Sequence, residues 1–267
     1  MTEDNIWQTI REEVLTEAER EPILASFLHA TILKHKSLED AISFHLASKL
    51  STSNLPAMIV REVIDEAFED DPQIGEAIRT DLRAIRNRDP ASKSYFEPLL
   101  HFKGFHALQS YRIAHWLWIK DRCALALYLQ NRISEVFCVD VHPAARIGTG
   151  ILIDHGTSVV IGETAVIEDN VSLLHEVTLG GTGKQTGDRH PKVRHGVLIG
   201  TGAKILGNVE IGEGAKIGAG SVVLDDVPPH CTVVGVPARV VGIPTVDEPA
   251  LEMDHNLLES HVEGSGI

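Results

Sequence analysis

Residues 197–223, VLIGTGAKILGNVEIGEGAKIGAGSVV, repeat a pattern of apolar and small residues every six positions. A short fixed period of this kind is typical of solenoids, in which each turn buries its inward side chains only against neighbouring turns. Two series carry the repeat, one at Ile199, Ile205, Ile211, Ile217 and Val223 and the other at Val197, Ala203, Val209, Ala215, Ser221 and Val227. Six residues per face and three faces per turn predict a left-handed parallel β-helix.

The same period extends toward the N-terminus as far as Asp140. One upstream series runs through Val141, Ile147, Ile153, Val159, Ala165, Val171 and Val177, and a second, offset by two, runs through Ile161, Ile167, Leu173 and Leu179. Leu179 and Ile199 are separated by three hexads and two further positions, so a loop must leave the coil between them. That loop contains GGTG at 180–183 and DRHP at 188–191. Loops on a rigid scaffold often carry function.

The chain before residue 139 has helical periodicity instead. Apolar residues recur three or four positions apart, for example at Ile23, Leu24 and Phe27, and each such group predicts one face of a helix. Ser37 stands where an N-cap is expected, ahead of a further apolar series. The first half is therefore expected to be all-α.

These patterns divide the chain into three parts. We expect an α+β protein with an N-terminal helical domain at 1–138, a left-handed β-helix catalytic domain at 139–243 and a flexible C-terminal tail at 244–267. The tail has no basic residue and six acidic ones. A segment of this composition buries too little apolar surface to fold alone.

Composition excludes several classes of function. The formal net charge is −14, whereas nucleic-acid binding requires clustered cations. No apolar stretch approaches the roughly 18 residues of a membrane span, and the first residues do not resemble a signal peptide, so we expect a cytoplasmic protein without membrane contact. The three cysteines lack CxxC pairing, which argues against a disulfide framework or a thiolate zinc site.

Several segments resemble the serine O-acetyltransferases, a branch of the hexapeptide-repeat acyltransferases. They come from both halves of the chain: RDP at 88–90, KGFHA at 103–107, DVHPAA at 140–145, DHGT at 154–157, VTLGGTGK at 177–184, GDRHPK at 187–192 and GVPAR at 235–239. The hexad repeat alone indicates only the superfamily, whereas DHGT together with GDRHP is far more specific. The resemblance implies transfer of an acetyl group from acetyl-CoA to L-serine, giving O-acetyl-L-serine and CoA in the first step of cysteine biosynthesis.

The chemistry of this transfer points to a histidine. A serine hydroxyl is a poor nucleophile at neutral pH, so its attack on a thioester needs a general base with a pKa near 7. We assign this role to His155. Asp140 precedes it by two and a half hexads, close to the three hexads of one coil, and is expected to orient the imidazole. The resemblance implies the same two roles, and direct transfer requires no acyl-enzyme.

The substrate is a zwitterion, which determines the other groups of the site. Asp89 and Asp154 suit the ammonium group, and Arg189 suits the carboxylate because a guanidinium binds carboxylates in bidentate geometry. His190 is expected to contact the bound amino acid or the tetrahedral intermediate. Asp89 lies in the helical half, so that half is expected to contribute to the substrate site.

Coenzyme A needs backbone amides, small residues and cations. The candidates for the first two are Gly181, Gly183, Ala203 and Ala219, and the candidate cations for its phosphates are Lys204, Lys216 and Arg239. Acetyl-CoA is expected as a co-substrate, and no metal is expected.

Three alternatives remain open. The acceptor hydroxyl could belong to homoserine or a sugar. His155, His190 and His195 are spaced like the metal ligands of the hexapeptide-repeat carbonic anhydrases. A non-enzymatic scaffold would use the coil only to trimerise and the tail to bind a partner.

The resemblance also implies partners. L-cysteine is expected to inhibit by occupying the serine site. The chain ends in Ile267, and serine acetyltransferases place a terminal isoleucine carboxylate in the active site of O-acetylserine sulfhydrylase. Coils of this class form trimers, and helical domains of this family join two trimers into a hexamer, so we expect a homo-oligomer.

Overall fold

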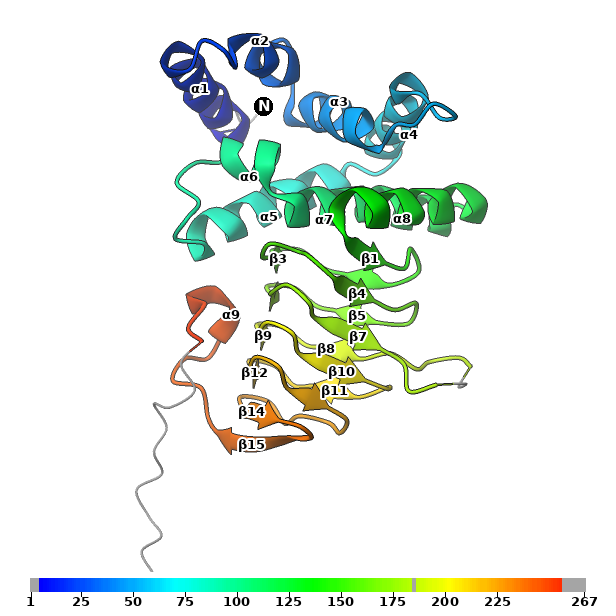
Figure 1. Cartoon of the computed structure of the whole chain (residues 1–267), viewed down its shortest axis with the longest axis vertical. Helices are drawn as coiled ribbons and strands as arrows, with labels where there is room; N and C mark the ends of the chain where they lie inside the picture. The colour runs from blue at the N-terminus through cyan, green and yellow to red at the C-terminus, as the bar shows by residue number, and fades with distance from the viewer. Residues whose placement is uncertain (1–4, 184–185, 256–267) are drawn as a thin grey trace, which may run out of the picture.

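The computed structural model describes residues 5–183 and 186–255. A helical part forms one end of the molecule, and a stacked β-solenoid extends from it (Figure 1). The helical elements are α1 (Asn5–Arg20), α2 (Ala25–Leu28), the π-helical η1 (His29–Leu33), α3 (Leu38–Leu50), α4 (Ala57–Asp70), α5 (Gln73–Arg88), α6 (Phe96–His101), α7 (Lys103–Ile119) and α8 (Cys123–Phe137). Ser37 caps α3, since its hydroxyl accepts a hydrogen bond from the backbone N–H of Asp40, and the predicted cap is confirmed.

The solenoid has three parallel sheets, one on each face of the triangular coil. Its strands are β1 (Val139–Val141), β2 (Arg146–Ile147), β3 (Leu152–Ile153), β4 (Val159–Ile161), β5 (Val166–Ile167), β6 (Ser172–Leu173), β7 (Thr178–Gly180), β8 (Lys192–Val193), β9 (Leu198–Ile199), β10 (Lys204–Leu206), β11 (Glu210–Ile211), β12 (Lys216–Ile217), β13 (Val222–Val223), β14 (Thr232–Gly235) and β15 (Ala238–Gly242). The sheets have the orders β1-β4-β7-β10-β13, β11-β8-β5-β2 and β15-β14-β12-β9-β6-β3; β14 and β15 pair antiparallel, and the other strand pairs of the described residues are parallel. The predicted combination of a helical domain and a β-solenoid is confirmed.

The strand register shows where the coil departs from its regular length. Strand neighbours are three hexads apart in regular turns, as for Ile161 and Leu179. In the first turn, where Val141 pairs with Ile161, the neighbours are two positions further apart. Across the loop, where Leu179 pairs with Ile205, they are eight positions further apart. The predicted loop is therefore present, and a second, shorter insertion of two residues precedes β4.

This shorter insertion corrects one of the upstream series. The sequence pattern joined Val141 to Val159 through an unbroken period of six, but the strand neighbour of Val141 is Ile161 and that of Val139 is Val159. Both inward series are apolar and lie two positions apart. After a two-residue insertion, residues of one series therefore occupy the positions at which the other series would have continued. The period of six in the sequence then looks unbroken.

A buried ion pair joins the helical part to the first coil. Asp81 of α5 has no exposed surface, and its carboxylate accepts hydrogen bonds from the Arg112 guanidinium at 2.7 Å and from the backbone N–H of Ile151 at 3.0 Å. Arg112, on α7, also donates to the carbonyl oxygen of Gly148 at 2.8 Å. Two helices are thereby attached to one corner of the solenoid.

Arg88, the last residue of α5, makes a second attachment. Its guanidinium donates to the carbonyl oxygen of Gly150 at 2.9 Å, to Oδ1 of Asn170 at 2.9 Å and to the hydroxyl of Ser172 at 3.2 Å. Desolvation lowers the pKa of Arg88 to about 10, so this buried guanidinium remains charged at neutral pH. The end of α5 is consequently fixed against the first two coils.

Part of the predicted flexible tail is folded against the solenoid. Residues 249–252 form the short helix α9 (Pro249–Glu252), where Pro249 and Ala250 are buried. The hydroxyl of Ser172 donates to the carbonyl oxygen of Ala250 at 2.9 Å, and Glu248 lies 3.3 Å from the His195 ring. Residues 256–267, including Ile267, lie outside the described part of the chain.

Several apolar residues near α2 remain at the surface. The sequence pattern assigned Ile23, Leu24 and Phe27 to one face of a helix, but Ile23 and Leu24 lie in a turn before α2, and the three residues are 89%, 42% and 41% exposed. Within the described residues, no helix is both long and apolar enough to span a bilayer.

The buried pair yields a prediction about stability. Arg112→Met leaves the Asp81 carboxylate buried without its counter-charge, which is expected to lower the free energy of unfolding by about 3–5 kcal/mol. Chemical denaturation followed by circular dichroism measures the change. Arg20→Met is the matched control, because it removes only a distant pair with Glu17 at 3.8 Å on an exposed helix surface. Equal stability of the two variants would contradict the role given to the buried pair.

Candidate active site

A cleft of about 750 Å³ lies between the helical part and one corner of the solenoid. It is lined by Asp89, Ala91, His101, Phe102, Lys103 and Gly104 from the helical part and by Asp154, His155, Thr157, His175 and Glu176 from two successive coils. The two parts approach closely here. A Cβ on Gly104 would lie 2.1 Å from the carbonyl oxygen of Ile153, so only glycine fits at that position.

The two-residue insertion before β4 forms the wall of the cleft that carries His155. His155 and Ser158 have φ values of 56° and 59°, a left-handed conformation that is uncommon outside glycine. The imidazole of His155 points away from the coil and is 72% exposed, with Nε2 3.8 Å from the Asp154 carboxylate. The extra residues therefore present this histidine to the cleft instead of to the core.

Asp89 faces His155 across the cleft from the end of α5. One of its carboxylate oxygens accepts a hydrogen bond from the backbone N–H of Ala91 at 2.8 Å. The preceding residue is the anchored Arg88, so the position of Asp89 relative to the coil is well fixed. Asp89, Asp154 and His155, which the sequence placed in one site, thus line one cleft.

Asp140 does not line this cleft. Its carboxylate lies on β1 and accepts a hydrogen bond from Nε2 of Gln130 at 2.8 Å. Within the described residues it makes no hydrogen bond with His155. Strand register pairs Asp140 with Val160, a few positions beyond the histidine.

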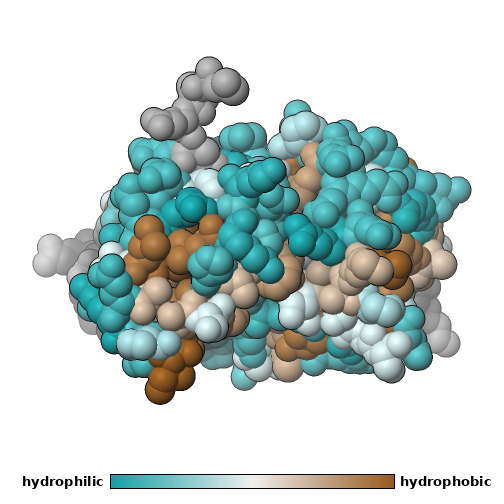
Figure 2. Space-filling model, turned by 90° about the horizontal axis from the view of Figure 1, so that it is seen from above, coloured by the Kyte–Doolittle hydropathy of each residue, from teal (hydrophilic) through white to brown (hydrophobic). Residues whose placement is uncertain are grey.

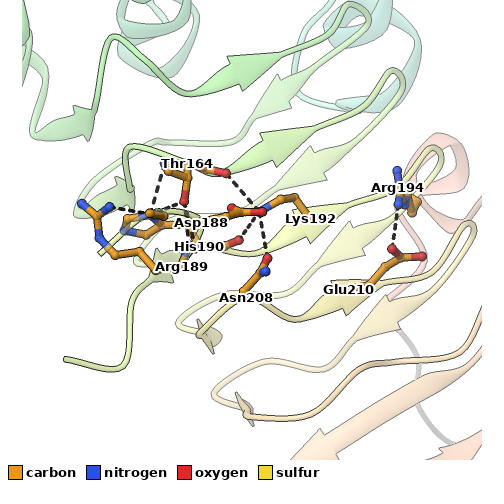
Figure 3. Close-up of polar contacts among 9 residues, drawn as sticks. Thr164, Asp188, Arg189, His190, Lys192, Arg194, Asn208 and Glu210 are labelled. Atoms are coloured by element: carbon orange, nitrogen blue, oxygen red, sulfur yellow. Dashed lines mark hydrogen bonds and ion pairs between the residues drawn. The ribbon is translucent and has the colours of Figure 1, made fainter. Parts of the chain in front are cut away.

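Arg189 and His190 lie beside Thr164 (Figure 3). Thr164 follows the end of β4, whereas His155 precedes its start, so the two groups lie at different corners of the coil. The Arg189 guanidinium donates to the Glu163 carboxylate at 2.5 Å. His190 is only 8% exposed, and its Nδ1 lies 3.1 Å from the backbone nitrogen and 2.9 Å from the hydroxyl of Thr164. Burial, with Arg189 close by, lowers the pKa of His190 from its ordinary value. Within one chain, these two residues are separated from His155 by the face of the coil that contains β4.

The predicted cofactor residues are distributed over several faces. Lys216 and Ala219 line a cavity of about 200 Å³ with Leu174, Thr201, Ile217, Gly218 and His255. Lys204 lies on another sheet, where its ammonium donates to the carbonyl oxygen of Glu176. Ala203 is buried inside the coil, and Arg239 is exposed on β15. Gly181 and Gly183 lie in the long loop, where Gly183 has a φ of 136°.

The three histidines of the metal alternative do not converge. His155 and His190 lie at different corners, and His195 lies 3.3 Å from Glu248 beside α9. Among residues 5–183 and 186–255, no cluster of three or more histidine, cysteine or carboxylate side chains has the arrangement of a metal site.

Two residues near the candidate groups were not singled out from the sequence. His175 occupies the cleft one coil beyond His155, with the two ring centroids 5.7 Å apart, and its Nδ1 is buried without a hydrogen-bond partner. Sequence spacing could have identified His175, because it follows His155 by the same number of residues that separates the strand neighbours Val141 and Ile161. Thr164 carries the contacts to His190, and only the strand register reveals that it lies beside the long loop.

Comparison with known proteins agrees with this arrangement. A family model described as the N-terminal region of serine acetyltransferase matches residues 6–110, and a bacterial transferase hexapeptide model of six repeats matches residues 190–225. The serine acetyltransferase of Salmonella typhimurium is 58% identical over 96% of this chain and 94% of its own. The crystal structure of the Vibrio cholerae enzyme is 63% identical, with a TM-score of 0.93 over 94% of this chain and 98% of its own.

Similar structures have been solved with ligands. A serine acetyltransferase in complex with cysteine has a TM-score of 0.93 and 56% identity over 95% of this chain and 99% of its own. The Brucella abortus enzyme in complex with coenzyme A has a TM-score of 0.89 and 52% identity, covering 90% and 96%. The Neisseria gonorrhoeae enzyme in complex with serine has a TM-score of 0.87 and 54% identity, covering 89% and 97%. With such similarity along nearly its whole length, the chain belongs to the serine acetyltransferase family.

Proposed function

We propose that the cleft between the helical part and the solenoid is where the chain transfers an acetyl group from acetyl-CoA to the hydroxyl of L-serine. The observation that carries this proposal is the convergence of Asp89, Asp154 and His155 on one cavity. Two carboxylates attract the ammonium group of an amino acid, and the exposed imidazole is available to its hydroxyl. The family membership of the chain makes it an acyltransferase with acetyl-CoA as co-substrate.

His155 acts as the general base in this proposal. Its imidazole takes the hydroxyl proton while the serine oxygen attacks the thioester carbonyl carbon. The carbon–sulfur bond then breaks, and the imidazolium returns the proton to the departing thiolate. Asp140 is the proposed orienting group, a role supported by its strand position beside Val160 and not by a contact within one chain.

The remaining substrate groups come from a second copy of the chain. β4 is three residues long, so the corner bearing Arg189 and His190 lies roughly 10 Å from the corner bearing His155. In a cyclic trimer of solenoids, the corner of one copy that bears His155 can face the corner of the neighbouring copy that bears Arg189 and His190. Arg189 of one copy would then bind the substrate carboxylate beside Asp89 and Asp154 of the next. L-cysteine, which has the same ammonium and carboxylate, is expected to inhibit by occupying these groups.

Coenzyme A is proposed to follow the His155 corner from coil to coil. The cavity lined by Lys216 and Ala219 includes Leu174, the neighbour of His175 in the cleft. Gly218 and Ala219 are small residues along this path, and Lys216 provides a positive charge. The thioester would thereby reach His155 from the side opposite the helical part.

Apolar surface at the helical end supports a larger assembly. Figure 2, viewed from that end, shows brown patches among hydrophilic side chains. Ile23, Leu24, Phe27 and Met58 are exposed apolar residues of the helical part. We propose that two trimers join there into a hexamer, which the mass of the assembly in solution would distinguish from a trimer.

His155→Ala should lower kcat by about 10²–10⁴-fold because it removes the proposed general base. Thiol release from acetyl-CoA with serine, homoserine or a sugar as acceptor measures both the loss and the acceptor preference. Serine should be preferred because both carboxylates and the cleft suit a short amino acid. A folded variant with near-normal activity would contradict the assignment of the base, and equal rates with a sugar would contradict the acceptor.

Mixed oligomers test whether the site is shared. His155→Ala and Arg189→Ala should each be nearly inactive alone. After dissociation and random reassembly in equal amounts, about a quarter of the sites would combine an intact His155 with an intact Arg189 from the neighbouring copy. The recovery of activity to that level supports a shared site. Verified mixed oligomers without recovery would contradict it.

The C-terminus is proposed to bind O-acetylserine sulfhydrylase through Ile267, which lies outside the described residues. Deleting Ile267 should abolish binding measured by calorimetry and leave serine acetylation unchanged, whereas Ile267→Leu should retain most of the affinity. Undiminished binding by the truncated chain would rule out this contact.

A further inference from the structure

The hydrogen bonds of Nδ1 define the protonation state of His190. The backbone N–H of Thr164 donates to this nitrogen, with the two nitrogens 3.1 Å apart. An amide N–H has no lone pair to offer, so Nδ1 must act as the acceptor. The hydrogen of the neutral imidazole therefore resides on Nε2.

The hydroxyl of Thr164 supports the same assignment. It accepts hydrogen bonds from the backbone N–H groups of Arg189 at 3.0 Å and His190 at 3.1 Å. Its own hydrogen lies within reach of Nδ1 of His190, 2.9 Å away, and of the Asp188 carboxylate, whose pKa it helps to lower. One threonine thus receives two donors from the loop backbone, and its backbone N–H donates to the ring.

Nε2 is left for a ligand. Within the described residues it makes no hydrogen bond, and the ring edge that carries it packs over Gly162. A Cβ on Gly162 would lie 2.1 Å from both Nε2 and Cδ2, so the absence of a side chain there makes room for the ring. The imidazole is consequently held with one nitrogen satisfied and the other unbonded.

Lys192 fixes the loop on which the ring is mounted (Figure 3). Its ammonium donates to Asp188 at 2.6 Å, to the carbonyl oxygens of His190 at 2.6 Å and Thr164 at 3.1 Å, and to Asn208 at 3.0 Å. These contacts join the loop to the coils on both sides of it. The position of His190 is therefore determined by the solenoid.

We propose that Thr164 is a positioning residue that holds His190 as the Nε2–H tautomer, so that His190 donates a hydrogen bond to the thioester oxygen as it becomes an oxyanion. This role rests on the proposed serine acetyltransferase activity and on the shared site. His190 exchanges no proton: the proton taken from serine moves to His155 and then to the thiolate sulfur. A preorganised donor aimed at a developing negative charge lowers the barrier without any change in its own protonation.

Burial lowers the pKa of His190, which agrees with this role. Arg189, Lys192 and His142 contribute in the same direction, and Glu163 opposes them. A pKa below the ordinary value keeps the ring neutral at neutral pH, where one nitrogen can accept while the other donates.

Substitution of Thr164 tests the proposal by kinetics. Thr164→Val keeps the shape but removes the hydroxyl, and kcat is expected to fall about 10–100-fold while the KM for acetyl-CoA stays nearly constant. Thr164→Ser should restore most of the activity. Thr149→Val is the matched control, since its hydroxyl also serves a coil corner by donating to Asp169 at 3.2 Å, away from the cleft. Failure of serine to rescue, or a change confined to the KM for serine, would overturn the proposal.

A second pair of variants separates hydrogen-bond donation from proton transfer. The amide nitrogen of glutamine occupies nearly the place of Nε2 and can donate without exchanging protons. His190→Gln should therefore be clearly more active than His190→Ala. Equal inactivity of the two would contradict the proposal, because the amide would then fail to replace the donor. These variants remain informative even if Thr164→Val does not fold.

Nitrogen NMR of the histidine-labelled protein reads the tautomer directly. The His190 signals, identified by their loss in His190→Gln, should show an unprotonated Nδ1 and a protonated Nε2 at neutral pH. A protonated Nδ1 would overturn the assignment. This readout does not depend on turnover, so an unmodified protein that failed to acetylate serine would contradict the proposed function and leave the tautomer measurable.

Discussion

The geometry of the protein depends on the stacking of inward apolar side chains in the solenoid. Each turn has too little interior to be stable alone, so the residues of one turn must lie directly beneath those of the next. This requirement keeps strand neighbours three hexads apart wherever the chain is regular. Extra residues in a turn do not fit inside the coil, so they must protrude at a corner. Both departures within the first turns carry candidate site residues: His155 in the short insertion and Arg189 and His190 in the long one.

The helical part completes one of these corners. Its attachment through Asp81, Arg112 and Arg88 uses buried charges that contact backbone carbonyls and amides of the first coils. Such contacts are directional, unlike apolar packing, so they fix the helices in one orientation. Asp89 follows directly after Arg88, so its position is fixed by the same contacts. A carboxylate from one part of the chain is thereby positioned against a histidine from another.

Much of this could be read from the sequence, and the exceptions have physical reasons. The period of six identified the solenoid, and local motifs identified Asp89, Asp154 and His155 as members of one cleft. The two-residue insertion was concealed because both inward series are apolar. The separation of Arg189 and His190 from His155 could not be deduced, since a corner assignment requires the register. The contact of Asp140 with Gln130 and the docking of Ala250 depend on individual hydrogen bonds, which leave no periodic trace in the sequence.

The hydroxyl of Ser172 links three parts of the chain, because it accepts from Arg88 and donates to the carbonyl oxygen of Ala250. Glu248, near the start of the same docked segment, raises the pKa of Arg88. In electrostatic terms, the docked segment provides a counter-charge to a desolvated cation at the end of α5. Undocking it would remove this counter-charge and expose the guanidinium of Arg88 to water. The attachment of α5 to the first coils, and with it the place of Asp89 in the cleft, is thus linked to a segment near the far end of the described chain.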